Sequence, residues 1–183
     1  TTCELYDPAT GTWSGPGAMA QGRQAASATL LNNGKLLVTG GYQGGTTFSS
    51  CELYDPSAGT WSATGSMSQV RTLHTVSLLP SGLVLAASGG PDGGAPVATC
   101  ELYDPSTGTW SPTGPVAQQR FSHAAVLLAT GKVLASGGSA GAGDLASCEL
   151  YDPATETWSA TGSMSAGRSY HPMALLPERM YRT

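Results

Sequence analysis

Charged and aromatic side chains are scarce in this chain of 183 residues: 11% are charged and 7% are aromatic, with two phenylalanines. The eight Lys and Arg residues are spread along the sequence and the net charge is −4, so the chain lacks the basic patch that binding to a phosphate backbone requires. Because no run of eighteen apolar residues exists, a membrane-spanning helix is not expected. We therefore expect no nucleic-acid partner and no membrane insertion.

Lysine is especially rare and stands beside abundant Ser, Thr and Gly, a composition typical of exported bacterial proteins. It favours a secreted or cell-surface protein, and nothing else in the sequence bears on the compartment. Glycine and proline are abundant, with 25 and 12 residues. Such a composition favours many short strands joined by tight turns over helices.

One sequence segment occurs four times with few changes. It starts with Cys-Glu-Leu-Tyr-Asp-Pro and ends with Thr-Trp-Ser, and the four cysteines are 48, 49 and 48 residues apart. The copies begin at Cys3, Cys51, Cys100 and Cys148. A constant period of this length is typical of propellers and solenoids.

The cysteines occupy one equivalent position in each copy. Equivalent atoms of neighbouring repeats should lie about 10 Å or more apart, which is beyond the reach of a disulfide. We therefore expect free thiols, and no CxxC pair provides the spacing of a metal site.

A single repeat, residues 71–111, predicts a four-stranded antiparallel sheet. Residues 72–79 are rich in β-branched and apolar side chains and stop at Pro80-Ser81-Gly82, which predicts a strand and a turn. Residues 83–88 form a second apolar strand, which ends at Gly89-Gly90. After a glycine-rich connection, residues 100–103 and 109–111 predict a hairpin around an Asp-Pro turn.

These features together resemble the kelch family. Its repeats carry an arginine and a histidine before the first strand, a double glycine after the second, and a tyrosine and a tryptophan at a fixed spacing. The double glycines here are Gly40-Gly41, Gly89-Gly90 and Gly137-Gly138, and the aromatic pairs are Tyr6/Trp13, Tyr54/Trp61, Tyr103/Trp110 and Tyr151/Trp158. The resemblance implies a β-propeller in which each repeat is one blade.

We therefore predict an all-β, kelch-type propeller of four-stranded blades with about four repeats. The full blades are expected at 19–62, 67–111 and 116–159, while 1–14 and 164–183 provide the last and first strands of a composite blade. This arrangement leaves three possibilities open: a closed four-bladed ring, half of an eight-bladed dimer, or an arc of a larger ring. Family resemblance favours six or seven blades, so we expect a fragment or a ring completed by self-association.

The connections from second to third strands should share one face with those that lead to the next blade. They are nine residues long and form the least similar part of the repeats: 42–50, 91–99 and 139–147. Divergent loops on a rigid scaffold are where recognition is expected. The candidate ligand contacts in these loops are Tyr42, Phe48, Asp92 and Asp144.

An arginine and a histidine should approach the same face in each repeat. They are Arg23, Arg71, Arg120 and Arg168, and His74, His123 and His171. A ring of such groups would suit an anion, a glycan or a transition metal. The alternative is structural: a glutamate follows each cysteine and provides an internal partner for each arginine, and kelch repeats commonly carry this histidine without metal.

A copper-dependent enzyme is a further alternative. Residues 168–171, Arg-Ser-Tyr-His, resemble the copper-binding stretch of galactose oxidase, a kelch enzyme in which adjacent tyrosine and histidine ligate copper. The resemblance also implies a crosslinked cysteine and tyrosine and another histidine, which cannot be placed here. We therefore expect no cofactor and a non-catalytic module that binds a protein or carbohydrate through its loops. A purely structural or designed repeat protein is the third possibility.

Overall fold

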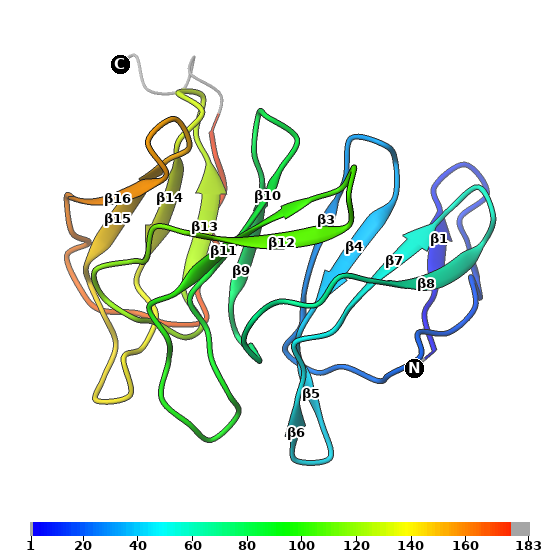
Figure 1. The fold of residues 1–183 in the computed structure, drawn as a ribbon, viewed down its shortest axis with the longest axis horizontal. Coiled ribbons are helices and arrows are strands. Elements are labelled where there is room, and N and C mark those ends of the chain that lie inside the picture. Colours follow the sequence, from blue (N-terminus) through cyan, green and yellow to red (C-terminus); the bar gives the residue numbers. More distant parts are fainter. Residues whose placement is uncertain (1, 177–183) are drawn as a thin grey trace.

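The computed structural model describes residues 2–176 and shows an all-β chain of antiparallel sheets that follow one another along the sequence (Figure 1). Three sheets have four strands, which pair in chain order. Blade one contains β3 (Ser27–Leu30), β4 (Leu36–Thr39), β7 (Cys51–Asp55) and β8 (Thr60–Thr64). Blade two contains β9 (Thr75–Leu78), β10 (Val84–Ala87), β11 (Cys100–Asp104) and β12 (Thr109–Thr113). Blade three contains β13 (Ala124–Leu127), β14 (Val133–Ser136), β15 (Cys148–Asp152) and β16 (Thr157–Thr161).

A half-blade precedes blade one. It consists of β1 (Leu5–Asp7) and β2 (Thr12–Ser14), in which Tyr6 pairs with Trp13 as Tyr54 pairs with Trp61 in blade one. A small hairpin, β5 (Tyr42–Gln43) and β6 (Thr46–Thr47), extends from the connection between β4 and β7. Residues 162–176 follow β16 without forming a strand, and the rest of the predicted composite blade, from residue 177 on, lies outside the described residues.

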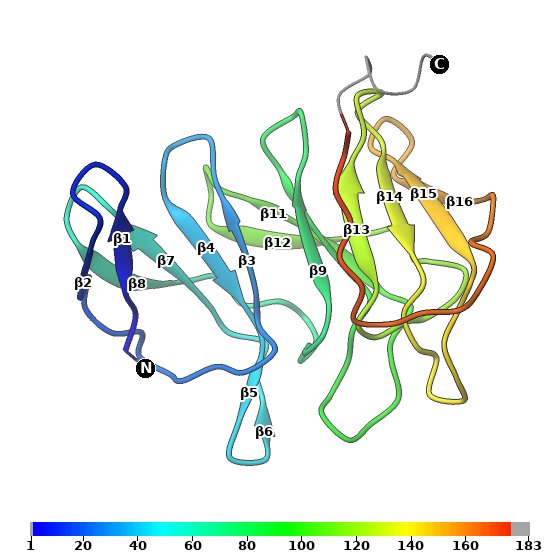
Figure 2. The ribbon, with the colours of Figure 1, turned by 180° about the vertical axis from the view of Figure 1, so that it is seen from behind.

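The blades stand side by side in an open arc. Their first strands β3, β9 and β13 are neighbours, and the half-blade and β16 lie at opposite ends in both views (Figures 1 and 2). The prediction of four-stranded antiparallel blades in a partial ring is therefore confirmed.

Burial is concentrated between the blades. The second strands form the most buried part of each sheet, and every residue of β10 is buried. Between blades one and two, Tyr103 is fully enclosed, and its hydroxyl shares a hydrogen bond of 2.6 Å with Thr64 Oγ1 of the preceding blade. Thr113 and Tyr151 repeat this contact between blades two and three at 2.7 Å. The tyrosines of blades two and three therefore each bond the fourth strand of the blade before them.

Three of the cysteines are part of this core. Cys51, Cys100 and Cys148 are buried free thiols, each close to the carbonyl oxygen two residues earlier. Burial raises the pKa of Cys51 to about 11 and also raises that of Cys100. Because the thiolate is the reactive form, these cysteines serve packing in the folded chain.

The double glycine has a different register in blade two than the sequence suggested. The structural equivalents of Gly40 and Gly41 are Ser88 and Gly89, and Ser88 adopts the left-handed backbone conformation with a φ of 55°. Its hydroxyl stabilises this conformation because it donates to the Val97 carbonyl and accepts from the Arg120 amide. Gly90 therefore lies one position beyond the pair.

Candidate functional site

The three predicted recognition loops extend from one end of the blades. In Figure 1 they are the β5–β6 hairpin and the loops after β10 and β14, all at the lower side. We call this side the loop face. The stems of the three loops have the same structure. In each loop one backbone amide, from Phe48, Val97 or Leu145, donates to the carbonyl of the glycine that precedes the loop. Their tips differ and are exposed.

A buried arginine holds both ends of each loop. Arg71 Nη1 donates to the carbonyls of Ser88 and Thr99 at 2.7 and 2.8 Å, and these residues lie on either side of the loop. Its Nη2 is 2.9 Å from Glu101 Oε1, and both side chains are almost inaccessible to water. The guanidinium thus cross-links the end of the second strand to the start of the third.

Blades one and three repeat this arrangement. Arg23 Nη1 donates to Gly40 and Ser50, and Arg120 Nη1 donates to Gly137 and Ser147. Their carboxylate partners are Glu52 at 3.0 Å and Glu149 at 2.7 Å. The other carboxylate oxygen accepts a backbone amide, from Ala20 in blade one and Ala117 in blade three. The three arginines are therefore saturated by internal partners.

This burial corrects the proposal that the arginines contact a ligand. The side chains of Arg23, Arg71 and Arg120 are at most 1% exposed, so an anion at the loop face cannot reach them. The structural alternative, pairing with the glutamate of the same repeat, holds for all three. Arg168 differs because it is exposed and its guanidinium has no partner among residues 2–176.

The histidines connect neighbouring blades. His74 Nε2 is 2.7 Å from Thr39 Oγ1 of blade one, and His171 Nε2 is 3.0 Å from Ser136 Oγ of blade three. The equivalent residue in blade two is Ala87, which has no hydroxyl, and His123 instead bonds Thr75 Oγ1 at 2.8 Å. Burial lowers the pKa of His74 and His123 to about 3, and the adjacent arginine adds to the shift.

Metal ligation finds no support in this geometry. Among residues 2–176 no group of three or more His, Cys, Asp or Glu side chains is placed to hold a metal ion. Tyr170, which the resemblance to galactose oxidase would make a copper ligand, is 75% exposed, whereas the adjacent His171 bonds Ser136. The copper-ligand set implied by that resemblance is therefore not assembled in the described part of the chain.

The loop residues predicted from sequence lie at different depths. Asp92 is exposed at a tip, and its carboxylate has no partner among the described residues. Asp144 is also exposed and accepts a hydrogen bond of 2.8 Å from Ser169. Tyr42 is half-buried, and the ring of Phe48 lies 5.3 Å below the guanidinium of Arg23. The exposed chemistry of this face is thus two carboxylates, the guanidinium of Arg168 beside the third loop, and glycine-rich backbone.

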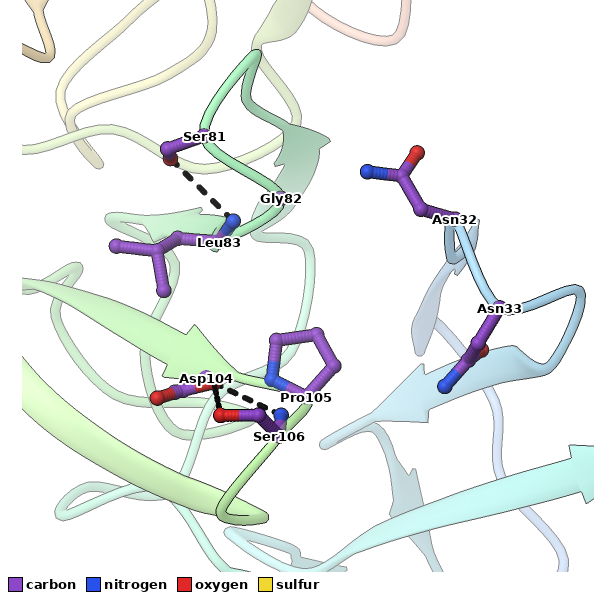
Figure 3. A pocket seen from close by; sticks show the side chains of 8 residues that line it. All are labelled: Asn32, Asn33, Ser81, Gly82, Leu83, Asp104, Pro105 and Ser106. Carbon is purple, nitrogen blue, oxygen red and sulfur yellow. Dashed lines mark hydrogen bonds between the residues drawn. The ribbon is translucent and has the colours of Figure 1, made fainter.

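A polar cavity of 350 Å³ lies on the opposite side, among the turns of blades one and two (Figure 3). Most of its polar side chains are engaged in their own turns: Asp104 accepts from the amide and hydroxyl of Ser106, and Asn33 accepts from the amide of Lys35. Among the amide and carboxylate side chains that line the cavity, Asn32 alone makes no such hydrogen bond in the described structure. Most of the polar side chains that line this cavity therefore serve to stabilise the turns.

The kelch motif is the family description that matches this chain, at residues 26–68 and 120–165. The two matching segments cover blade one and blade three. A solved structure described as "Structure of YjhT" superposes with a TM-score of 0.75 at 17% identity, covering 86% of this chain and 57% of that one. These kelch repeats therefore span little more than half the length of that structure, and the likeness concerns the fold. The comparison with curated proteins found no match.

No helix in residues 2–176 has the length and apolar character of a membrane span.

Proposed function

We propose that this kelch-repeat chain is a non-catalytic binding module whose loop face recognises a protein. Kelch repeats form propeller-type modules that are often used for binding. The observation that carries the proposal is the pairing of constant stems with divergent tips. A recognition surface needs side chains that vary on a backbone that does not move, because ordering a loop upon binding costs affinity.

The buried arginines provide that rigidity. Each one joins two backbone carbonyls on either side of its loop, and a glutamate compensates its charge inside the blade. Charge-assisted hydrogen bonds of this kind are stronger than those between neutral groups. The loop tips are therefore mounted on stems that stay fixed while a partner binds.

The chemistry of the tips favours a basic protein segment. The loops contain Asp92 and Asp144 and no Lys or Arg, while Gly44, Gly45, Gly93 and Gly94 leave the backbone accessible. Exposed carboxylates attract Lys and Arg side chains, and accessible backbone groups bond an extended peptide. A tip without an exposed aromatic ring offers no stacking platform for a sugar, so protein is favoured over carbohydrate.

The test is a peptide library displayed on phage and a glycan array, both probed with the 183-residue chain. We expect enrichment of Lys- and Arg-containing peptides, and an affinity at least about tenfold weaker for the double variant Asp92→Lys/Asp144→Lys. Glu156→Lys reverses an exposed charge on the opposite side and serves as the matched control. Loop-dependent binding to a glycan, or no binding that depends on these loops, would overturn the proposal.

A further inference from the structure

Asn33 and Gly34 form the tip of the hairpin between β3 and β4, and they are the one Asn-Gly sequence in the chain. The equivalent turns of blades two and three contain Ser81-Gly82 and Thr130-Gly131, with a hydroxyl in place of the amide. An asparagine before a glycine is chemically labile, because the glycine nitrogen can attack the side-chain carbonyl carbon and no side chain of its own hinders it. Of these three similar turns, that of blade one therefore carries the reactive pair.

Both groups of this reactive pair are accessible at the surface. Asn33 and Gly34 are exposed, and a Cβ on Gly34 would meet no atom within 4 Å. Gly34 has a φ of 80°, so the turn favours glycine at this position and the approach to its nitrogen stays open. Figure 3 shows the amide nitrogen of Asn33 at the free end of its side chain, pointing away from the turn. Solvent can therefore supply base and water to this site and carry ammonia away.

A hydrogen bond holds the side chain of Asn33 over the peptide that follows it. Its Oδ1 accepts from the Lys35 amide at 3.1 Å, which folds the side chain back past Gly34. This bond brings Cγ of Asn33 towards the Gly34 nitrogen, because that nitrogen lies between the two residues that the bond joins. The bond also withdraws electrons from the carbonyl carbon that is attacked. Nδ2, the leaving group, has no hydrogen-bond partner among residues 2–176.

One contact opposes the reaction. The Gly34 amide donates to the Leu31 carbonyl at 2.9 Å, so the nitrogen can attack only when this bond is open and the proton is lost. Hydrogen bonds in an exposed turn open at a low free energy, since few contacts hold them. The folded turn therefore delays the attack without preventing it, and comparison with the unfolded chain measures the delay.

We propose that Asn33 is a site of spontaneous deamidation, at which water converts the side-chain amide into a carboxylate. In the first step a bond forms between the Gly34 nitrogen and Cγ of Asn33, and the Cγ–Nδ2 bond breaks. The proton of the Gly34 amide leaves with Nδ2 as ammonia, and a succinimide ring remains. Water then opens the ring at Cγ, which gives aspartate, or at the backbone carbonyl carbon, which gives isoaspartate with one more carbon in the main chain.

The products change blade one in two ways. Either product adds a negative charge to the polar cavity that Asn33 and Asp104 both line (Figure 3). Isoaspartate also lengthens the main chain within a turn that the Leu31 amide closes by donating to the Lys35 carbonyl at 2.8 Å. The extra carbon strains this turn, because β3 and β4 pair in a fixed register on either side of it. Isoaspartate should therefore destabilise blade one, whereas aspartate leaves the main chain unchanged.

The experiment incubates the folded 183-residue chain at mildly alkaline pH and follows it by tryptic mapping, with a sample digested at once as background. Cleavage after Arg23 and Lys35 yields residues 24–35, in which fragmentation separates conversion at Asn33 from conversion at Asn32. We expect Asn33 to convert first, at a rate that rises about tenfold per pH unit with the deprotonated fraction of the Gly34 amide. The rate should be at most about tenfold below that of the same chain unfolded in urea. Electron-transfer fragmentation then distinguishes isoaspartate from aspartate.

Two substitutions in the turn separate the chemistry from the fold. Asn33→Ser gives blade one the Ser-Gly turn of blade two and should abolish the conversion, with an unchanged circular dichroism spectrum. Asn32→Ser is the matched control and should leave the rate at Asn33 unchanged. The isoaspartate form, purified by ion exchange, should unfold at a lower urea concentration than the unconverted chain. Faster conversion of Asn32, a rate independent of pH, or protection of Asn33 by more than about tenfold in the folded chain would overturn the proposal. None of these results depends on what the loop face binds.

Discussion

Identical residues in the repeats have different roles because their surroundings differ. Arg71 is enclosed by two carbonyls and Glu101, whereas Arg168 has the same sequence context and is exposed. A buried arginine is tolerated only with such partners, since an unpaired buried charge costs several kcal/mol. The residue type alone therefore does not reveal whether it stabilises a blade or is available to a partner.

The buried histidines make the stability of the fold sensitive to mild acid. The pKa of His74 and His123 falls to about 3 in the folded chain from the ordinary value of 6.5. Between these values the unfolded chain binds protons that the folded chain does not. The free energy of unfolding therefore increases as the pH rises through this range and decreases as the pH falls. Each histidine contributes a slope of up to about 1.4 kcal/mol per pH unit.

We therefore predict that urea denaturation of the chain shows a falling free energy of unfolding from pH 6.5 to 4.5. His74→Gln should reduce the slope in this window and lower stability at neutral pH, because the bond with Thr39 is altered. Asp55 and Asp104, whose pKa values lie below 3.8, add their own loss of stability only at lower pH. A slope unchanged by the substitution would contradict the assignment of this transition to His74.

The hairpins are the elements that sequence predicted most directly. Asn32-Asn33-Gly34 and Pro80-Ser81-Gly82 connect the first two strands as expected, with a positive φ at Gly34 and Gly82. The predicted strand over 72–79 is shortened to Thr75–Leu78 because Leu73 adopts a φ of 56°. That conformation allows the backbone bond with Ala25 of the neighbouring blade, which no local pattern reveals.

Gly89, the equivalent in blade two of Gly41 and Gly138, is required by close packing as well as by its backbone angle. A Cβ on Gly89 would lie 2.6 Å from the Cβ of His74 and 2.7 Å from the Thr72 carbonyl. Gly93, in the same loop, has nearly the same φ, 70° against 73°, and open surroundings. The two positions therefore separate the cost of the angle from the cost of the clash.

We predict that Gly93→Ala lowers the free energy of unfolding by about 1 kcal/mol, the cost of a left-handed alanine. Gly89→Ala should cost a further 1 to 3 kcal/mol, roughly, because the surrounding backbone must shift. Urea denaturation at neutral pH measures both. Equal losses at the two positions would show that the strands do not crowd at Gly89.

At the scale of the whole molecule, the repeat period predicted the architecture and the divergent loops predicted the face that we propose for recognition. The period alone did not decide between a ligand and the glutamate after each cysteine as the partner of each arginine. The structure decides for the glutamate, which lies 29 or 30 residues away in sequence from the buried guanidinium that it pairs with. The period could not place Ser88 either, since a serine replaces a glycine where its hydroxyl finds two partners. Long-range contacts therefore set what the repeat pattern leaves open.

Stability in a repeat array depends on the number of neighbours that each unit has. Blade two is flanked by blades one and three, whereas blade three has a full neighbour on one side among residues 2–176. Units at an end open locally at a lower free energy than units in the middle. The buried thiols Cys100 and Cys148 report on blades two and three, because each reacts only when its blade opens.

We predict that Cys148 reacts with a thiol reagent at least about tenfold faster than Cys100, a difference of about 1.4 kcal/mol in opening free energy. Single-cysteine chains, with the other cysteines replaced by alanine, make the two rates separable at low urea. Equal rates in the two single-cysteine chains would show that the blades open as one cooperative unit, and the neighbour argument would then fail.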